Sequence, residues 1–326
     1  MLAVVKHLRD QKPLPLSEGS LIVQMRQGSG CVPVYWIDPD LDEFKIGQSI
    51  TANIPIYAVE IRRPSLWFDS ATGNETKGLP TVEQIVEPCV AAIKAHTHFS
   101  RCILCGHSFA GVIAFEAARQ LAPLGIEVET ILVFDTVLFT PSSHGAAWQK
   151  LKEIWFPASN TPISIPMVGR LKSSLWIMRW LLGFKWKGLT DLIVNALARP
   201  AGPAEGLTTK LDDMGKPIAW PKLKFVYDNA MNSYRVSPLD GSGVLFRAES
   251  RQDVTAYAEP QLGWTGLFRK GLKTVSVPGD HWSMLWQPHA KVLAREISLI
   301  LSGTLAEQEE REAGPASEQR SEPRIG

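Results

Sequence analysis

The sequence predicts an α/β fold with a mostly parallel β-sheet and helices on both faces. Short apolar runs recur along the chain, and their hydrophobicity is continuous rather than alternating, as in strands that are buried on both faces. Helical patterns separate several of these runs, which is the order expected when helices connect parallel strands. One apolar run, ending at Cys105, leads through Gly106-His107-Ser108 directly into a helical pattern, as at a tight strand-to-helix turn.

The elements follow one another between residues 21 and 302, which we interpret as one domain. The apolar runs that we expect to be strands are residues 21–25, 31–37, 54–58, 101–105, 130–134, 243–248 and 273–277. The expected helices are residues 81–95, the segment from Ser108 to Leu121, and residues 288–301. The first helix opens on Thr81, and Gln84 stands where a capping box requires it.

Three segments differ in character from this core. Residues 1–20 are polar and contain prolines, which predicts a leader or linker. Residues 141–225 are rich in tryptophan, proline and lysine, which predicts a helical lid inserted between two strands, over the sheet edge where such folds bind ligands. Residues 303–326 are rich in Glu, Gln, Arg and Pro, and we expect a disordered acidic tail there.

The composition is that of an ordinary globular domain. The chain has 326 residues, of which 45% are hydrophobic, and a net charge of +1, which argues against nucleic-acid binding. No signal sequence is recognisable, and the longest apolar segment is too short to span a membrane, so we expect a cytoplasmic protein. The four cysteines predict neither a disulfide framework nor a metal site.

The turn at Ser108 is the clearest chemical signal. A serine on a strained strand-to-helix turn needs small residues two positions before and two after it, because the two backbones pass close together there. Gly106 and Ala110 occupy these positions; glycine is usual at the second, and Gly111 follows it. The strand before and the helix after favour a nucleophilic Ser108 over a serine that only caps a helix. We expect His107 to be a packing residue.

A nucleophilic serine requires a base, and the base requires an acid that orients it. His281 follows a glycine-containing loop after the last strand and precedes the closing helix, so it is expected at the same sheet edge as Ser108. Two acids compete for the third role. Asp135 directly follows an apolar strand, whereas Asp253 lies several residues beyond its strand. We favour Asp135 and keep Asp253 as the alternative acid.

Acyl chemistry at Ser108 also requires two backbone N–H groups to bind the oxyanion. Phe109, the residue after the serine, is expected to supply one of them. The other is expected from the loop after the strand at residues 31–37. Pro39 has no N–H, so we assign the second donor to Asp40 or a neighbour.

Further motifs accompany the turn and support a family resemblance. They are Gly106-His107-Ser108-Phe109, Asp135 at the end of the next strand, Tyr234-Arg235 ahead of residues 244–248, Leu262-Gly263-Trp264, and Gly279-Asp280-His281-Trp282-Ser283-Met284-Leu285. With them, residues 20–302 resemble the thioesterase domain that ends nonribosomal peptide and polyketide synthases, an α/β-hydrolase. The sequence departs from that family at Ala110 and in the loop at residues 38–40, which lacks the usual glycines.

The resemblance implies a function and a partner. Ser108 would take an acyl, polyketide or peptidyl chain from the phosphopantetheine arm of an acyl or peptidyl carrier protein. The acyl-enzyme would then pass the chain to water or to an internal hydroxyl or amine. The resemblance supports Asp135 as the acid and implies no resident cofactor, because the partner supplies the arm. A carboxylester hydrolase or lipase, and a catalytically silent binding module, are the alternatives.

The predicted lid adds expectations about partners and substrate. Residues 141–225 contain twelve Lys or Arg and five Asp or Glu, and this surplus favours docking of an acidic carrier protein. Trp176 and Trp180 extend an apolar helical stripe and are candidates to line an acyl channel. A solvated helix face is the alternative to docking. Contact of this helix, through its basic flanks, with an anionic membrane surface is a third interpretation.

Overall fold

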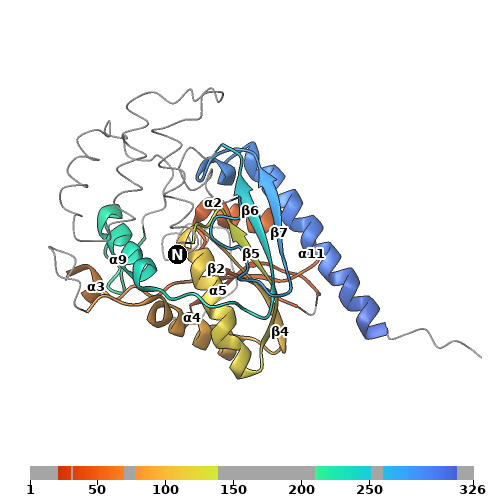
Figure 1. The fold of residues 1–326 in the computed structure, drawn as a ribbon, viewed down its shortest axis with the longest axis horizontal. Coiled ribbons are helices and arrows are strands. Elements are labelled where there is room, and N and C mark those ends of the chain that lie inside the picture. The colour runs from red at the N-terminus through yellow and green to blue at the C-terminus, as the bar shows by residue number, and fades with distance from the viewer. Residues whose placement is uncertain (1–20, 31, 70–77, 139–209, 251–259, 314–326) are drawn as a thin grey trace, which may run out of the picture.

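The computed structural model describes residues 21–30, 32–69, 78–138, 210–250 and 260–313 (Figure 1). Within these ranges a seven-stranded sheet has the order β1-β3-β2-β4-β5-β6-β7. The strands are β1 Ile22–Arg26, β2 Val34–Ile37, β3 Ile56–Val59, β4 Arg101–His107, β5 Glu127–Phe134, β6 Ser242–Ala248 and β7 Leu272–Val277. Neighbours pair in parallel except β1 and β3, which are antiparallel. The mostly parallel sheet that the sequence predicts is confirmed.

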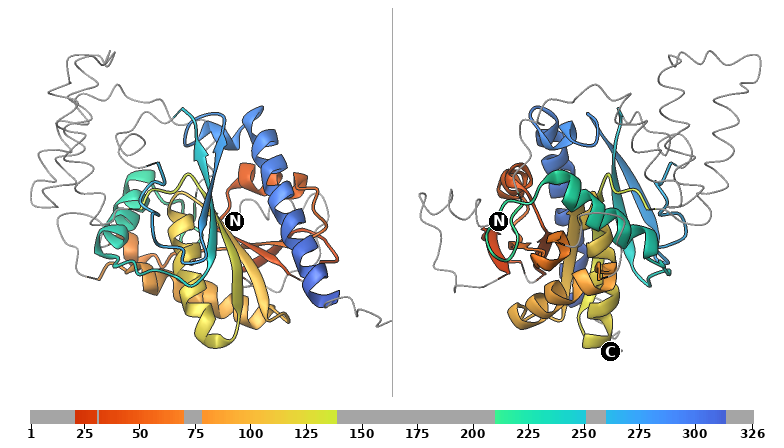
Figure 2. Two further views of the ribbon diagram at one scale, coloured as in Figure 1. Left: turned by 45° about the vertical axis from the view of Figure 1, so that its right-hand side comes forward. Right: turned by 90° about the vertical axis from the view of Figure 1, so that its left-hand side faces the viewer.

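Helices cover both faces of the sheet (Figures 1 and 2). The described helices are α2 Leu41–Ser49, α3 Leu66–Asp69, α4 Val82–His96, α5 Phe109–Leu121, α9 Trp220–Ser233 and α11 His289–Ala313, with short 3-10 turns η1 Ala122–Leu124 and η3 Ser283–Leu285. Residues of α4 and α5 form one core with Leu104 and Val133, and residues of α2 and α11 form the other with Cys105 and Phe134. Adjacent residues of one strand thus enter different cores, which explains the continuous apolar runs.

The start of α4 has the capping box that its sequence predicts. Thr81 Oγ1 accepts a hydrogen bond from the backbone N–H of Gln84 at 3.3 Å, and Gln84 Oε1 accepts from the N–H of Thr81 at 3.0 Å. These two bonds satisfy N–H groups that a helix end otherwise leaves unpaired.

Helix α2 is an element that hydrophobic periodicity does not predict. Its sequence is largely polar and contains Gly47, so its apolar face is weak. Asp40 and Glu43 nevertheless form a complete capping box at its N-terminus. The spacing of these two acids is the sequence signal that identifies the helix.

Helix α11 is longer than expected. It continues through Gly303 to Ala313, so the predicted disordered tail cannot begin at residue 303. Alanine, leucine and glutamate are strong helix formers, and they dominate this extension. The predicted leader, residues 314–326 of the tail and residues 141–209 of the predicted lid lie outside the described residues.

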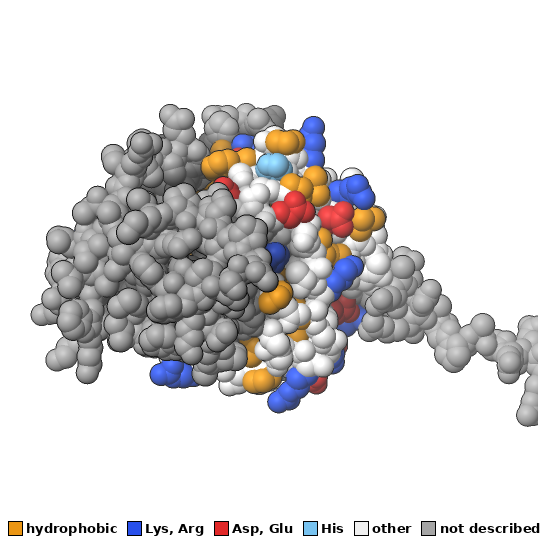
Figure 3. Space-filling model, turned by 45° about the horizontal axis from the view of Figure 1, so that its top comes forward, with side chains coloured by type: hydrophobic (Ala, Val, Ile, Leu, Met, Phe, Trp, Pro, Cys, Tyr) orange, Lys and Arg blue, Asp and Glu red, His pale blue; other side chains and the backbone are white. Residues whose placement is uncertain are grey.

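Charged and apolar side chains share the described part of the surface in Figure 3. Basic and acidic groups are interspersed there with hydrophobic ones. Across the described ranges, no helix is both long enough and apolar enough to cross a membrane.

Candidate active site

Ser108 lies on the turn between β4 and α5. Its φ is 54° and its ψ is −124°, a conformation that residues other than glycine rarely adopt. A Cβ on Gly106 would lie 2.5 Å from the carbonyl of Ala110, and a Cβ on Gly111 would lie 2.2 Å from Thr136 Oγ1. Both positions therefore require glycine. Ala110 itself is accommodated in the core with 7% exposure, so its methyl group is compatible with the turn.

His281 lies in the loop between β7 and η3, at the same edge of the sheet as Ser108. Its Nε2 is 3.1 Å from the Oγ of Ser108, and its Nδ1 is 2.8 Å from Oδ2 of Asp135. A carboxylate only accepts hydrogen bonds, so we assign the ring proton to Nδ1, which leaves Nε2 to accept from the serine hydroxyl. The imidazole is 27% exposed, whereas the Asp135 side chain is fully buried.

Asp135 directly follows β5, with a φ of 44°. Its Oδ1 accepts a hydrogen bond from the N–H of Ala248 at 3.0 Å, and its own N–H donates to the carbonyl of Phe246 at 2.8 Å. Both contacts come from β6 and hold the carboxylate with Oδ2 toward His281. The structure thus brings Ser108, His281 and Asp135 into one hydrogen-bonded series, while Asp253 lies outside the described residues.

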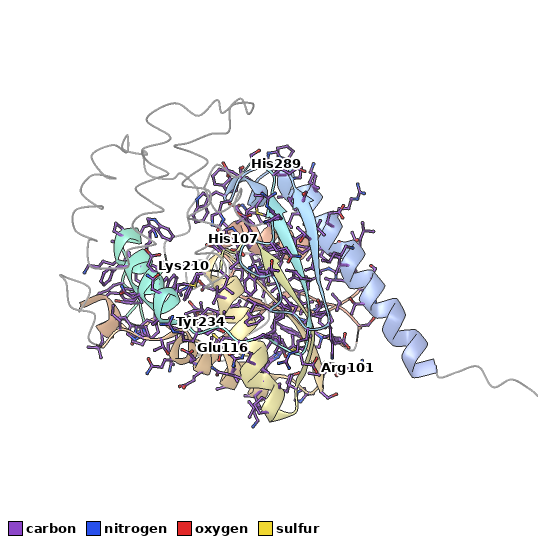
Figure 4. The ribbon with its side chains drawn as sticks, in the orientation of Figure 1. Arg101, His107, Glu116, Lys210, Tyr234 and His289 are labelled. Atoms are coloured by element: carbon purple, nitrogen blue, oxygen red, sulfur yellow. The ribbon has the colours of Figure 1, made fainter. Side chains whose placement is uncertain are left out.

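His107 contributes more to the site than packing. Its Nε2 lies 2.9 Å from the backbone carbonyl of His281, and the two rings lie 4.5 Å apart between centroids. Because a carbonyl only accepts, we assign the proton of His107 to Nε2. His107, near the upper end of α5 in Figure 4, therefore supports the backbone of His281 from the strand that precedes Ser108.

The loop that contains His281 is closed by hydrogen bonds of Asp280. One oxygen of this carboxylate accepts from the N–H of Trp282 at 3.0 Å and from the N–H and hydroxyl of Ser283 at 2.8 Å. The hydrogen bond from the Ser283 N–H, more than any other contact, lowers the pKa of Asp280. Gly279 precedes it with a φ of 97°, which favours glycine. These contacts restrict where the imidazole can lie.

The two predicted oxyanion donors differ in the structure. Phe109 begins α5, so its N–H belongs to the helix end whose N–H groups have no intrahelical acceptor. Asp40 instead donates its N–H to Glu43 Oε2 at 3.0 Å, as the N-cap of α2. We therefore correct the assignment of Asp40, because the capping box already engages that N–H. Hydrophobic periodicity does not predict α2, so it also does not predict that Asp40 acts as the N-cap of this helix.

The site thus offers a hydroxyl, an imidazole and a buried carboxylate in series beside a helix N-terminus. Among the described residues, no group of His, Cys, Asp or Glu side chains is arranged to hold a metal ion. The candidate substrate-lining residues Trp176 and Trp180 lie outside the described residues. The chemistry available here is nucleophilic attack by an oxygen whose proton an adjacent imidazole can accept.

Three of the solved structures that are similar to this chain illustrate the likeness. A holo four-domain nonribosomal peptide synthetase bound to AMP and glycine has a TM-score of 0.51 and 19% identity, over 90% of this chain and 21% of that one. The wild-type Vlm2 thioesterase domain has a TM-score of 0.46 and 18% identity, over 85% of this chain and 96% of that domain. The NocB thioesterase domain has a TM-score of 0.48 and 15% identity, over 86% of this chain and 99% of that domain.

The chain spans about a fifth of the length of the four-domain synthetase. No protein-family model matches it, and no curated protein matches it in sequence. At these identities the likeness shows the fold. That fold is the α/β-hydrolase fold expected from the resemblance to synthetase thioesterase domains.

Proposed function

We propose that this chain is a serine thioesterase that releases an acyl, polyketide or peptidyl chain from the phosphopantetheine arm of a carrier protein. The hydrogen-bonded series Ser108–His281–Asp135 is the observation that supports this proposal most directly. The order serine, acid, histidine along the chain and the strained serine turn are those of hydrolases with this fold.

In this proposal each residue of the series has a distinct role. Ser108 Oγ attacks the thioester carbonyl carbon while His281 Nε2 accepts the hydroxyl proton. The N–H of Phe109 donates to the oxygen that becomes negative. When the carbon–sulfur bond breaks, His281 returns the proton to the departing thiolate, which leaves an ester on Ser108. Asp135 holds the imidazole in the productive tautomer and stabilises its cation.

In the second half-reaction Ser108 becomes the leaving group, and His281 again accepts a proton and then returns it. Water, or a hydroxyl or amine of the bound chain, attacks the ester carbonyl carbon as His281 accepts its proton. The tetrahedral intermediate collapses, the ester bond to Ser108 breaks, and His281 returns the proton to the serine oxygen. Attack by water releases the chain as a carboxylic acid. Attack by an internal hydroxyl or amine releases it as a cyclic product.

The sequence motifs that resemble synthetase thioesterases, and the fold shared with part of a four-domain nonribosomal peptide synthetase, support a thioester on a carrier protein as the substrate. The surplus of Lys and Arg over Asp and Glu in residues 141–225 supports an acidic partner. Within residues 210–225, however, Lys210, Lys222 and Lys224 contact the chain itself, so part of this charge serves the fold. The lack of a resident cofactor and the cytoplasmic location stay predictions.

Incubation with an acyl-pantetheine thioester followed by mass spectrometry tests the proposal. We expect an acyl adduct on Ser108 of the wild type, and no adduct or turnover with Ser108→Ala. Ser49→Ala, an exposed serine of α2, is the matched control and should retain full activity. Turnover by Ser108→Ala would contradict the proposal. A higher kcat/KM for oxygen esters than for pantetheine thioesters would favour the carboxylester hydrolase, and no adduct with either would favour the silent binding module.

A further inference from the structure

A buried cluster of charges lies beside the proposed active site. Asp38 follows β2 and neighbours the serine turn, because β2 and β4 are adjacent in the sheet and Trp36 pairs with Cys105. The backbone of Asp38 has a φ of 49°, close to the 54° of Ser108. Two adjacent strands thus end in a strained residue at the same sheet edge.

Asp38 is held by two cations that come from different parts of the chain. Arg63 Nη2 donates to its Oδ2. Lys210 Nζ lies 3.1 Å from the same oxygen and donates to the backbone carbonyl of Asp38 at 3.0 Å. The side chains of Asp38, Arg63 and Lys210 are 10%, 1% and 16% exposed. Burial alone would raise the pKa of Asp38, but the two cations bring it below its usual value, so the carboxyl is ionised.

Arg63 connects this cluster to the serine turn. Its Nε donates to the hydroxyl of Tyr227 at 3.0 Å, and its Nη1 donates to the carbonyl of Ile61 at 2.9 Å. The Tyr227 ring stacks on the ring of Phe109, with centroids 4.0 Å apart and planes at 14°. Phe109 follows Ser108 and bears the N–H that we assign to the oxyanion. The contacts therefore run from Asp38 to the residue that would bind the developing charge.

Helix α9 also contacts the loop that holds the base. The ring of Trp220 lies 6.1 Å from that of Trp282 at an interplanar angle of 76°, and Trp282 follows His281. Trp220 and Tyr227 are seven residues apart and lie on the same face of α9. One face of this helix thus contacts the sequence neighbour of Ser108 and the sequence neighbour of His281. In the view of Figure 4, Lys210 lies between α9 and His107.

We propose that Lys210 and Tyr227 are positioning residues for the acyl-transfer site, acting through Asp38 and Phe109. This inference rests on the proposed function. Lys210 connects the segment before α9 to the turn after β2 through its contacts with Asp38. The ring of Tyr227 stacks on Phe109, which bears the oxyanion donor. Stabilisation of an oxyanion depends on donors that are already in place when the charge develops. Loss of either contact should therefore slow the chemical step more than it weakens substrate binding.

Kinetics of Lys210 variants test the proposal. Lys210→Met should lower kcat by about 10- to 100-fold, the effect of a displacement near 1 Å, with KM changed by less than about 3-fold. Lys210→Arg keeps the charge and should restore most of kcat. Lys224→Met is the matched control: Lys224 is exposed on α9, pairs with Asp228 at 2.8 Å, and should leave kcat within about 2-fold.

A second variant and a second readout keep the test independent of folding and substrate. Tyr227→Phe keeps the ring on Phe109 but loses the hydroxyl that accepts from Arg63, so it should lower kcat by a smaller factor than Lys210→Met. The rate at which a fluorophosphonate labels Ser108 should fall in parallel with kcat, because phosphonylation also places negative charge on an oxygen at this site. We express kcat and the labelling rate per folded molecule, and thermal unfolding gives the folded fraction of each variant.

The outcomes separate this inference from the proposed function. If Lys210→Met and Tyr227→Phe lower the melting temperature but leave kcat and the labelling rate unchanged, the cluster is only structural and the proposal is overturned. A rise in KM alone would also overturn it, since Lys210 would then bind substrate. If the wild type labels at Ser108 but cleaves no thioester, the proposed function fails. A slower labelling rate in Lys210→Met would still support the positioning role.

Discussion

Asp38 and Asp135 differ in their partners although their local sequences are alike. Each aspartate directly follows a buried apolar strand, Val34-Tyr35-Trp36-Ile37 in one case and Ile131-Leu132-Val133-Phe134 in the other. Their φ angles are 49° and 44°, and both lie at the carboxyl edge of the sheet. Asp135 faces the imidazole of His281, whereas Asp38 faces Arg63 and Lys210.

The local sequence places a strand-ending aspartate, but residues distant in the sequence determine its role. His281 is 146 residues from Asp135, and Lys210 is 172 residues from Asp38. The cationic side chains of Arg63 and Lys210 neutralise the Asp38 carboxylate and stabilise the turn after β2. An imidazole can exchange its Nε2 proton with a substrate, so its partner Asp135 can take part in catalysis.

Asp135→Asn should give the largest effect. The amide cannot hold the imidazole with its proton on Nδ1, so kcat should fall by about 10³–10⁴-fold while the fold persists. Steady-state kinetics and circular dichroism measure the two effects. Asp240→Asn, an exposed aspartate before β6, is the control and should behave as wild type. Retention of more than about a tenth of kcat by Asp135→Asn would point to another acid, with Asp253 the first candidate.

In contrast to Asp135→Asn, Asp38→Asn should lower the stability of the protein more than its activity. It leaves the buried Arg63 without its carboxylate, and breaking a buried pair in this way costs about 3–5 kcal/mol of unfolding free energy. Urea unfolding measures that loss, with Asp240→Asn again as the control. We expect the loss of kcat per folded molecule to be far smaller than that of Asp135→Asn. Equal losses of kcat in the two variants would show that the two aspartates do not differ in role.

Glu43 is a third buried acid, and its hydrogen-bond donors are N–H groups rather than cations or an imidazole. Its oxygens accept from Trp36 Nε1 at 2.9 Å and from the N–H of Asp40 at 3.0 Å. Burial and the adjacent Asp40 carboxyl raise the pKa of Glu43 from 4.5 to about 8. In that interval the native state binds a proton that the unfolded state has released. The unfolding free energy should therefore fall as pH rises from 4.5 to about 8, and this contribution should level off above.

Glu43→Gln tests this pH dependence, because the amide does not titrate. The variant should lose about 1 kcal/mol from one missing hydrogen bond, and its unfolding free energy should decline less between about pH 5 and 9 than that of the wild type. Urea unfolding at several pH values measures the slope. Glu87→Gln, an exposed position on α4, should keep the wild-type slope. Parallel profiles for Glu43→Gln and wild type would contradict the raised pKa.

Much of the fold was predictable because its signals are local. Buried parallel strands read as continuous apolar runs, and Gly106 marks the close approach of strand and helix at Ser108. The assignment of Asp40 failed because hydrophobic periodicity does not detect α2. The charge cluster was not predicted at all, since nothing near Arg63 in the sequence indicates that it meets Asp38.

The order of the reactive groups along the chain is predictable without the structure: a serine on a tight turn, an aspartate that ends a strand, and a histidine before the last helix. The three-dimensional fold is needed to show that His281 contacts Ser108 and Asp135, that the N–H of Asp40 donates to Glu43, and that Lys210 pairs with Asp38. Backbone strain and burial periodicity act over a few residues, whereas a hydrogen bond between side chains requires the sheet to bring distant strand ends to one edge.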